Sequence, residues 1–174
     1  AMIRELMPDA KTVGLLYTSS ETNSEVQAAL YEEMAGEFGF EIVSATVTAG
    51  AEVSQAVQAL LPQADCLSML TDNTVVSYLA VVLAAAEQAG KPVFGSEIEQ
   101  VALGCAGAEG LDYVALGKQT GEMAARVLNG ESAESISFET IRDSALYFNT
   151  DVLASLGLEI PAAMAERGYT DMAE

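Results

Sequence analysis

Histidine is absent from this sequence of 174 residues, and positively charged side chains are scarce. The absence of histidine removes the commonest general base, the base of the serine-hydrolase triad and the usual zinc ligand. A hydrolase or a metal enzyme would have to work without all of these. We therefore expect no catalytic residues, no metal site and no cofactor in this chain.

Only 7 lysines and arginines stand against 26 aspartates and glutamates, so the net charge is -19. Such a charge repels the phosphates of nucleic acids and the anionic head groups of a membrane surface. The acids are spread along predicted helices, for example at Glu25, Glu33 and Glu122, which is typical of solvated helix faces. DNA, RNA and membrane surfaces are therefore disfavoured as partners.

Cysteine and long apolar runs are also scarce. Cys66 and Cys105 each lie in a short apolar stretch, which favours two buried free thiols over a disulfide. The most apolar segment, 75–86, is too short to span a membrane and is typical of a helix buried in a core. Residues 1–5 lack the basic, apolar leader of a signal peptide, so we expect either a cytoplasmic protein or one whose N-terminal part has been removed.

Strand and helix patterns alternate along the chain. This alternation predicts an α/β fold, a three-layer α/β/α sandwich with a mainly parallel sheet, and the length suits one domain or one lobe of a larger protein. The expected strands are 13–17, 40–47, 66–70, 92–95, 104–108, 136–141 and 145–149. The expected helices are 23–38, 51–61, 74–89, 97–103, 112–128 and 150–156, followed by a frayed tail.

Polar residues follow four of the predicted strands, in short loops that open the next helix. Because the carboxyl ends of parallel strands frame the crevice in which small ligands bind, we expect these loops to converge on one edge of the sheet and to contact a polar ligand. Helix capping and turn formation explain the same residue types equally well. The candidate ligand-binding residues are Ser19, Ser20, Asn23, Ser24, Thr71, Asp72, Asn73, Thr74, Ser96, Glu97, Asp112 and Tyr113.

Other functions of α/β folds lack their motifs here. No G-x-G-x-x-G follows the first strand, so dinucleotide binding is not indicated. The nucleophile-elbow pattern G-x-S-x-G is absent. The end of the first strand, from Tyr17 to Ser20, lacks the acidic pair with which a phosphorylated receiver domain holds magnesium. These absences favour binding over catalysis.

Several segments, taken in order, carry a resemblance to a known family. They read DAKTVGLLY at 9–17, SSETNS at 19–24, TDNTV at 71–75, KPVFGSE at 91–97, GLDY at 110–113, LGKQTGEMA at 116–124, LYFN at 146–149 and LGLEIP at 156–161. Together they resemble the second lobe in a family of ABC transporter substrate-binding proteins, which adopts the periplasmic-binding-protein type I fold. Some members take up aromatic amino acids such as tryptophan or phenylalanine, so the resemblance implies an α-amino-acid ligand.

The resemblance also implies a domain assignment. Members of the family carry a complete first lobe before this region, so residues 1–174 resemble the C-terminal lobe of a two-lobed protein, with 112–130 crossing toward the first lobe. It further implies delivery of a solute to an ABC permease, an extracytoplasmic location and no catalysis. An exposed crossing helix would favour a homo-oligomer of the chain alone.

An amino-acid ligand makes specific demands on the loops. Its carboxylate suits the N–H groups at the start of helix 74–89 and the polar side chains of loop 71–74. Its ammonium needs a carboxylate such as Asp72 or Glu97. The alternative function is the effector-binding domain of a cytoplasmic transcriptional regulator with the same fold, which would carry a basic helix-turn-helix before its first lobe.

Overall fold

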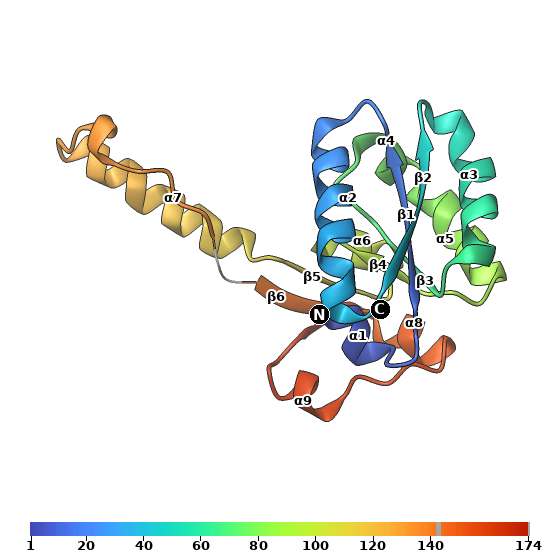
Figure 1. The fold of residues 1–174 in the computed structure, drawn as a ribbon. Helices are drawn as coiled ribbons and strands as arrows, with labels where there is room; N and C mark the ends of the chain where they lie inside the picture. Colours follow the sequence, from blue (N-terminus) through green and yellow to red (C-terminus); the bar gives the residue numbers. More distant parts are fainter. Residues whose placement is uncertain (142–143, 174) are drawn as a thin grey trace.

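A computed structural model describes residues 1–141 and 144–173 and shows a twisted sheet between layers of helices (Figure 1). Within these residues the sheet has seven strands in the order β2-β1-β3-β4-β5-β6-β7. The strands are β1 (Thr12–Thr18), β2 (Glu41–Val47), β3 (Cys66–Ser68), β4 (Val93–Gly95), β5 (Gly107–Leu111), β6 (Ser144–Phe148) and β7 (Thr170–Asp171).

The first five strands run parallel to one another. Strand β6 is antiparallel to β5, and β7 pairs in parallel with β6. The expected α/β fold with a mainly parallel sheet is therefore confirmed. It follows that β1, β3, β4 and β5 all end at the same edge of the sheet.

Helices cover both faces of the sheet. The α-helices are α1 (Met2–Leu6), α2 (Thr22–Ala35), α3 (Val53–Leu60), α4 (Asn73–Ser77), α5 (Leu79–Gln88), α6 (Ile98–Ala102), α7 (Tyr113–Leu128), α8 (Thr150–Ser155) and α9 (Ala162–Ala165). One apolar core cluster joins α3 and α5 to the sheet, and a second joins α1, α2, α8 and α9 to the opposite face. Among the described residues, no helix is both long and apolar enough to cross a membrane.

The two cysteines lie in these two clusters. Cys66 and Cys105 are each fully buried and free, as the sequence predicts. Burial is the main reason that the pKa of each thiol is raised to about 12. Both thiols therefore stay protonated at neutral pH and pack as small apolar side chains.

The single helix predicted over 74–89 is wrong. Two helices, α4 and α5, meet at Tyr78, whose backbone leaves the helical conformation at φ -111° and ψ 18°. The ring of Tyr78 lies against Gly50, where an added Cβ would come within 2.0 Å of the ring. Helix propensity over this apolar stretch is thus overridden by a tertiary contact that the local pattern does not contain.

The C-terminal third also differs from expectation. Residues 136–141, predicted as a strand, form no strand, and the strand predicted at 145–149 lies at 144–148 as β6. The tail predicted to be frayed contains α9 and the short strand β7. Met164 of α9 is fully buried in the second core cluster, so a tertiary contact orders a segment whose local pattern is weak.

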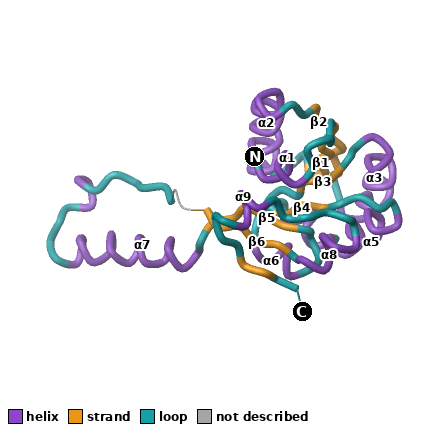
Figure 2. Tube along the Cα trace, turned by 90° about the horizontal axis from the view of Figure 1, so that it is seen from below, coloured by secondary structure: helices purple, strands orange, loops and turns teal. Residues whose placement is uncertain are grey.

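A long arm, residues 113–141, projects from the body of the molecule (Figures 1 and 2). It consists of α7 and the chain that returns alongside it, and α7 has no buried residue. Its exposed apolar side chains include Val114, Val127, Leu128 and Phe138, of which Leu128 and Phe138 are 87% and 89% exposed. The arm therefore has little to hold its place in this chain alone.

Close packing between β5 and β6 leads to a stability prediction. A Cβ at Gly107 would lie 2.4 Å from a ring carbon of Phe148 and 3.0 Å from the carbonyl oxygen of Tyr147. Gly107→Ala should therefore lower the free energy of unfolding by about 1–3 kcal/mol, measured by urea denaturation. Gly36→Ala is the control, because a Cβ there meets open space and the backbone is already helical. Equal stability of the two variants would contradict the packing of β5 on β6.

Candidate functional site

The four polar loops converge on one edge of the sheet, as the sequence predicts. They follow β1, β3, β4 and β5, which are parallel to one another. Hydrogen bonds join the loops in two groups. The first group connects the loops after β1 and β3, and the second connects the loops after β4 and β5.

A buried carboxylate holds the first group together. Asp72 is only 1% exposed. Its Oδ2 accepts hydrogen bonds from the backbone N–H of Thr18 at 2.7 Å and the hydroxyl of Ser24 at 2.8 Å. Its Oδ1 accepts from the hydroxyl of Thr18 at 2.9 Å and the N–H of Val75 at 2.7 Å. Asp72 thus caps α4 and fixes the end of β1 and the start of α2 with the same side chain.

These contacts keep Asp72 ionised although it is buried. Burial is the largest single influence and opposes ionisation, but the hydrogen bonds from Val75, Thr18 and Ser24 together outweigh it, so the pKa of Asp72 lies below its usual value. Because the lone pairs of the carboxylate are engaged within the chain, the structure gives Asp72 a structural role. Ser24, which is fully buried, shares that role.

A second carboxylate, which is not among the predicted site residues, occupies the start of α4. Glu21 accepts hydrogen bonds from the backbone N–H and the side-chain amide of Asn73, both at 2.9 Å. It also accepts from the N–H and the hydroxyl of Thr74, both at 3.1 Å. These bonds lower the pKa of Glu21, and the bond from the backbone N–H of Asn73 has the largest effect. The N–H groups expected to receive a ligand carboxylate therefore already hold the carboxylates of Glu21 and Asp72.

The rest of this group ties α2 to the loop after β3. Asn23 donates to the carbonyl of Thr71, and the amide of Gln27 both donates to the hydroxyl of Thr71 and accepts from its N–H, the latter at 3.0 Å. Ser19 and Ser20, at the tip of the loop after β1, are exposed. Within the described residues the side chains of these two serines make no hydrogen bond, whereas the exposed Asn23 is tied to Thr71.

The second group lies at the ends of β4 and β5. The hydroxyl of Tyr113 donates to a carboxylate oxygen of Glu97 at 3.2 Å. Burial of the ring, and then the charge of Glu97, raise the pKa of Tyr113, so this phenol remains a donor. Asp112 caps α7 by accepting from the N–H groups of Val114 and Ala115 through one oxygen, Oδ1.

Ser96 is held in place by a buried amide that the sequence did not single out. Gln100 is fully buried, and its side-chain oxygen accepts from the N–H of Ser96 at 2.8 Å. Its amide donates to the carbonyl of Leu70 at 3.4 Å, which links the ends of β3 and β4. The available sequence signal was a glutamine next to the apolar residues Ile98 and Val101 in the predicted helix 97–103, and only the structure shows that it is buried.

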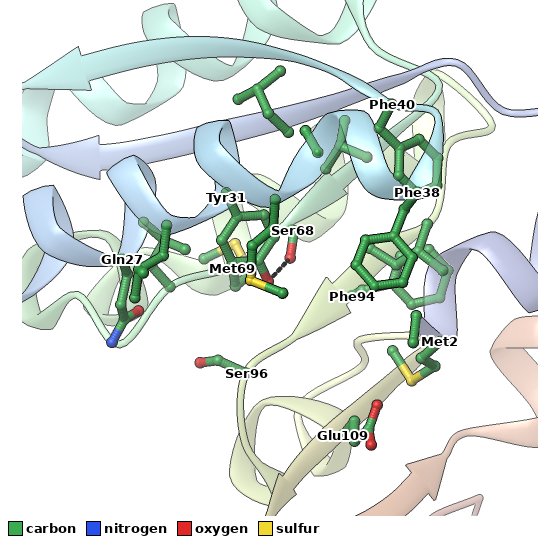
Figure 3. Close-up of a pocket in the computed structure, with 18 of the residues that line it drawn as sticks. Met2, Gln27, Tyr31, Phe38, Phe40, Ser68, Met69, Phe94, Ser96 and Glu109 are labelled. Atoms are coloured by element: carbon green, nitrogen blue, oxygen red, sulfur yellow. Dashed lines mark hydrogen bonds between the residues drawn. The ribbon is translucent and has the colours of Figure 1, made fainter.

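Below this edge, a cavity of about 570 Å³ extends between α2 and the sheet (Figure 3). Gln27, Thr71 and Ser96 line it near the edge, and Met2, Phe38 and Glu109 line its far part. Most of the wall is apolar, with one internal hydrogen bond of 2.8 Å between the hydroxyls of Tyr31 and Ser68. Two predicted site residues, Thr71 and Ser96, thus stand beside an apolar cavity that the sequence did not reveal.

The sheet order, the layers of helices and the polar edge define a lobe of the periplasmic-binding-protein type. A family model described as "ABC transporter substrate binding protein" matches residues 1–169. The chain belongs to this family of substrate-binding proteins.

Relatives and solved structures agree with this family. A tyrosine-binding protein of Clostridioides difficile is 32% identical over 158 residues, covering 91% of this chain and 46% of the relative. The ABC domain in complex with L-Trp from Streptococcus pneumonia matches with a TM-score of 0.85 and 26% identity, covering 97% of this chain and 59% of that one. The ligand-free, open structure of CD0873, a substrate-binding protein with adhesive properties from Clostridium difficile, matches with a TM-score of 0.84 and 34% identity. This match covers 99% of this chain and 57% of that one. The chain thus spans about half the length of the curated relative it matches.

The contacts of Asp72 lead to a pH prediction. Its pKa is lower in the folded state than the unfolded value of about 3.9, so its contribution to stability is present above that value and is lost as the pH falls through the folded-state pKa. Asp72→Asn should therefore lower the free energy of unfolding by about 2 kcal/mol or more at neutral pH. The NH2 group of the new amide would face groups that are themselves hydrogen-bond donors, four of which now bond to the carboxylate.

Denaturation in urea at several pH values measures this cost. The difference from the unsubstituted chain should shrink as the pH falls below about 4. Asp151→Asn, which alters an exposed acid at the start of α8, serves as the control and should change little. A difference that is constant with pH would show that the ionised form of Asp72 is not what the fold requires.

Proposed function

We propose that this chain is one lobe of a two-lobed protein that captures an amino acid with an aromatic side chain and delivers it to an ABC importer. The observation that carries the proposal is the convergence of polar loops from four parallel strands on one edge of the sheet. Support for the ligand comes from relatives described as tyrosine-binding and as bound to L-Trp. Proteins of this family act outside the cytoplasm, and we place this chain there as well.

Glu97 is the best candidate for the ammonium group of the ligand. It is partly exposed at the edge, and among the described residues the one side chain that bonds to it is Tyr113. Asp112 adds a second carboxylate, of which only Oδ1 is engaged in capping α7. Two carboxylates and a phenol favour a cation. Asp72 is less suited to this role, because its four hydrogen bonds would have to break first.

The ligand carboxylate needs donors. Because Glu21 and Asp72 occupy the start of α4, the exposed hydroxyls of Ser19 and Ser20 are better placed to donate to it from this lobe. The other lobe would supply the remaining contacts, since closure of two lobes excludes water from the ligand. Binding of this kind requires no catalytic group, and we propose no reaction.

The arm supports the two-lobed proposal. The L-Trp complex covers 97% of this chain, so most of the arm has an equivalent there, and 41% of that complex lies outside the match. We therefore assign the exposed apolar side chains of α7 to contact with a first lobe, with 112–130 as the crossing segment. A helix without buried residues gains its stability from such a contact.

The ammonium assignment is tested on the full-length, two-lobed protein. Glu97→Gln should weaken binding of L-tyrosine or L-tryptophan about 30-fold, or about 2 kcal/mol, because a desolvated ammonium loses its counter-charge. Isothermal titration calorimetry measures the change. The matched control is Glu99→Gln, an exposed acid two residues away in α6, which should bind as the unsubstituted protein does. An unchanged affinity for the Glu97 variant would remove this residue from the site.

The arm predicts association of the chain when it is produced alone. Its exposed apolar side chains should drive formation of a dimer or larger oligomer at tens of micromolar, with little affinity for free amino acids. Leu128→Glu should shift the chain toward monomer in sedimentation velocity, whereas Glu134→Gln, also on the arm, should not. A compact monomer of the unsubstituted chain, or tight binding of an amino acid by it, would contradict the two-lobed proposal.

A further inference from the structure

Four helices at the loop edge are preceded by an acidic residue. The N-cap residues are Glu21 before α2, Asp72 before α4, Glu97 before α6 and Asp112 before α7. A carboxylate at the start of a helix is stabilised when it accepts hydrogen bonds from the free N–H groups of the first turn. We therefore compared what each of the four carboxylates bonds to.

Three of them are engaged by backbone N–H groups, and one is not. Asp72 accepts from the first turn of α4 at 2.7 Å, and Asp112 accepts twice from the first turn of α7, at 2.9 and 3.0 Å. Glu21 accepts from two N–H groups at the start of α4, at 2.9 and 3.1 Å. Glu97 makes no cap bond to α6, and within the described residues its carboxylate accepts from the hydroxyl of Tyr113 at 3.2 Å. Glu97 is thus the carboxylate of this set that the backbone leaves free.

A buried amide accounts for this difference. Gln100 is the third residue of α6 and is fully buried. Its Oε1 accepts from the backbone N–H of Ser96 at 2.8 Å. In a capping box, a glutamine at the third helical position reaches back in this way to an N–H at the helix start, and Gln100 reaches one residue farther. The bond holds the chain before α6 extended, with Glu97 at φ -155° and ψ 167°, whereas Asp112 has φ -78° and ψ 97°.

Close packing fixes both the amide and the loop. A Cβ at Gly95 would lie 3.0 Å from Oε1 of Gln100, and a Cβ at Gly110 would lie 3.3 Å from the Cα of Glu97. The amide nitrogen of Gln100 also donates to the carbonyl of Leu70 at 3.4 Å. The loop that carries Glu97 therefore lies between Gln100 on one side and β5 on the other.

We propose that Gln100 is a positioning residue for the ammonium group of the ligand, because its bond to Ser96 holds Glu97 with its carboxylate free at the loop edge. The inference rests on the proposed function, in which Glu97 is the partner of the ammonium. Without the amide, the N–H of Ser96 would lose its acceptor, and the carboxylate of Glu97 would turn to the N–H groups of α6, as that of Asp112 does at α7. Gln100 acts through Glu97, since it is itself fully buried.

A double-mutant cycle in the full-length, two-lobed protein tests this role, with the affinity for L-tyrosine measured by isothermal titration calorimetry. Gln100→Met has a side chain of similar length and lacks the acceptor. It should weaken binding about tenfold when Glu97 is present, because the loop loses the bond that orients this carboxylate. In the Glu97→Gln background it should weaken binding by less than about twofold, because the residue through which it acts is gone.

A merely structural role of Gln100 gives a different result. The loss of a structural tie would lower the affinity by the same factor in both backgrounds. Gln63→Met is the matched control, since Gln63 is exposed, precedes β3 at the opposite edge of the sheet and donates to the carbonyl of Ala59. It should leave the affinity unchanged in both backgrounds.

A second variant disturbs the same amide without removing it. Gly95→Ala places a Cβ against Oε1 of Gln100 and should weaken binding about threefold or more when Glu97 is present, and little in the Glu97→Gln background. Its control is Gly36→Ala, where a Cβ meets open space. If circular dichroism shows that Gln100→Met does not fold, the Gly95 variant completes the cycle.

Hydrogen exchange on the 174-residue chain tests the contact itself, without any ligand. The amide hydrogen of Ser96 should exchange at least about tenfold faster in Gln100→Met than in the unsubstituted chain, because its acceptor is gone. Gln63→Met should leave this rate unchanged.

Several results would overturn the inference. They are an unchanged affinity of both the Gln100 and the Gly95 variants, an equal loss of affinity in the two backgrounds, and an unchanged exchange rate of the Ser96 amide. If the unsubstituted full-length protein binds neither L-tyrosine nor L-tryptophan, the proposed function fails and the inference fails with it. If that protein binds its ligand and the cycle shows no coupling between Gln100 and Glu97, the inference alone fails.

Discussion

The loop edge of this lobe depends on one buried carboxylate. Asp72 joins the end of β1, the start of α2 and the first turn of α4 through four hydrogen bonds, and each of these elements carries part of the candidate site. A buried charge is stable only when its lone pairs are engaged, so the donors around it cannot move independently. This constraint holds the loops of the edge in fixed positions. At the protein surface, the hydrogen bonds of Glu21 to Asn73 and Thr74 connect the same two loops a second time.

Two apolar surfaces, the cavity beside α2 and the arm, are open to solvent in this chain. A folded domain rarely leaves contiguous apolar surface open unless another polypeptide covers it. Met2 and Ile3 of α1 line the cavity, and the arm carries α7 away from the body (Figure 2). The exposed arm accords with the proposed two-lobed protein, since this chain covers 46% of one relative and 57% to 59% of two solved structures.

Much of the fold was predictable because the local pattern repeats. Alternating strands and helices predicted the parallel sheet, and the sheet in turn predicted that loops after β1, β3, β4 and β5 meet at one edge. The break at Tyr78 and the order of the tail were not predictable, because each depends on a contact with a distant residue or core. Glu21 was overlooked for the same reason, since its partners Asn73 and Thr74 lie 52 and 53 residues away.

The sequence by itself determined the class of the protein, the absence of histidine chemistry and the family, since composition, periodicity and ordered motifs are properties of the chain alone. Only the tertiary structure decided which polar residues are free to meet a ligand. Asp72 and Glu97 follow their strands in the same way, yet one accepts four hydrogen bonds in the interior and the other bonds to a phenol at the surface. Burial and hydrogen-bond partners are set by the packing of distant segments, and that packing separates a structural carboxylate from a candidate binding one.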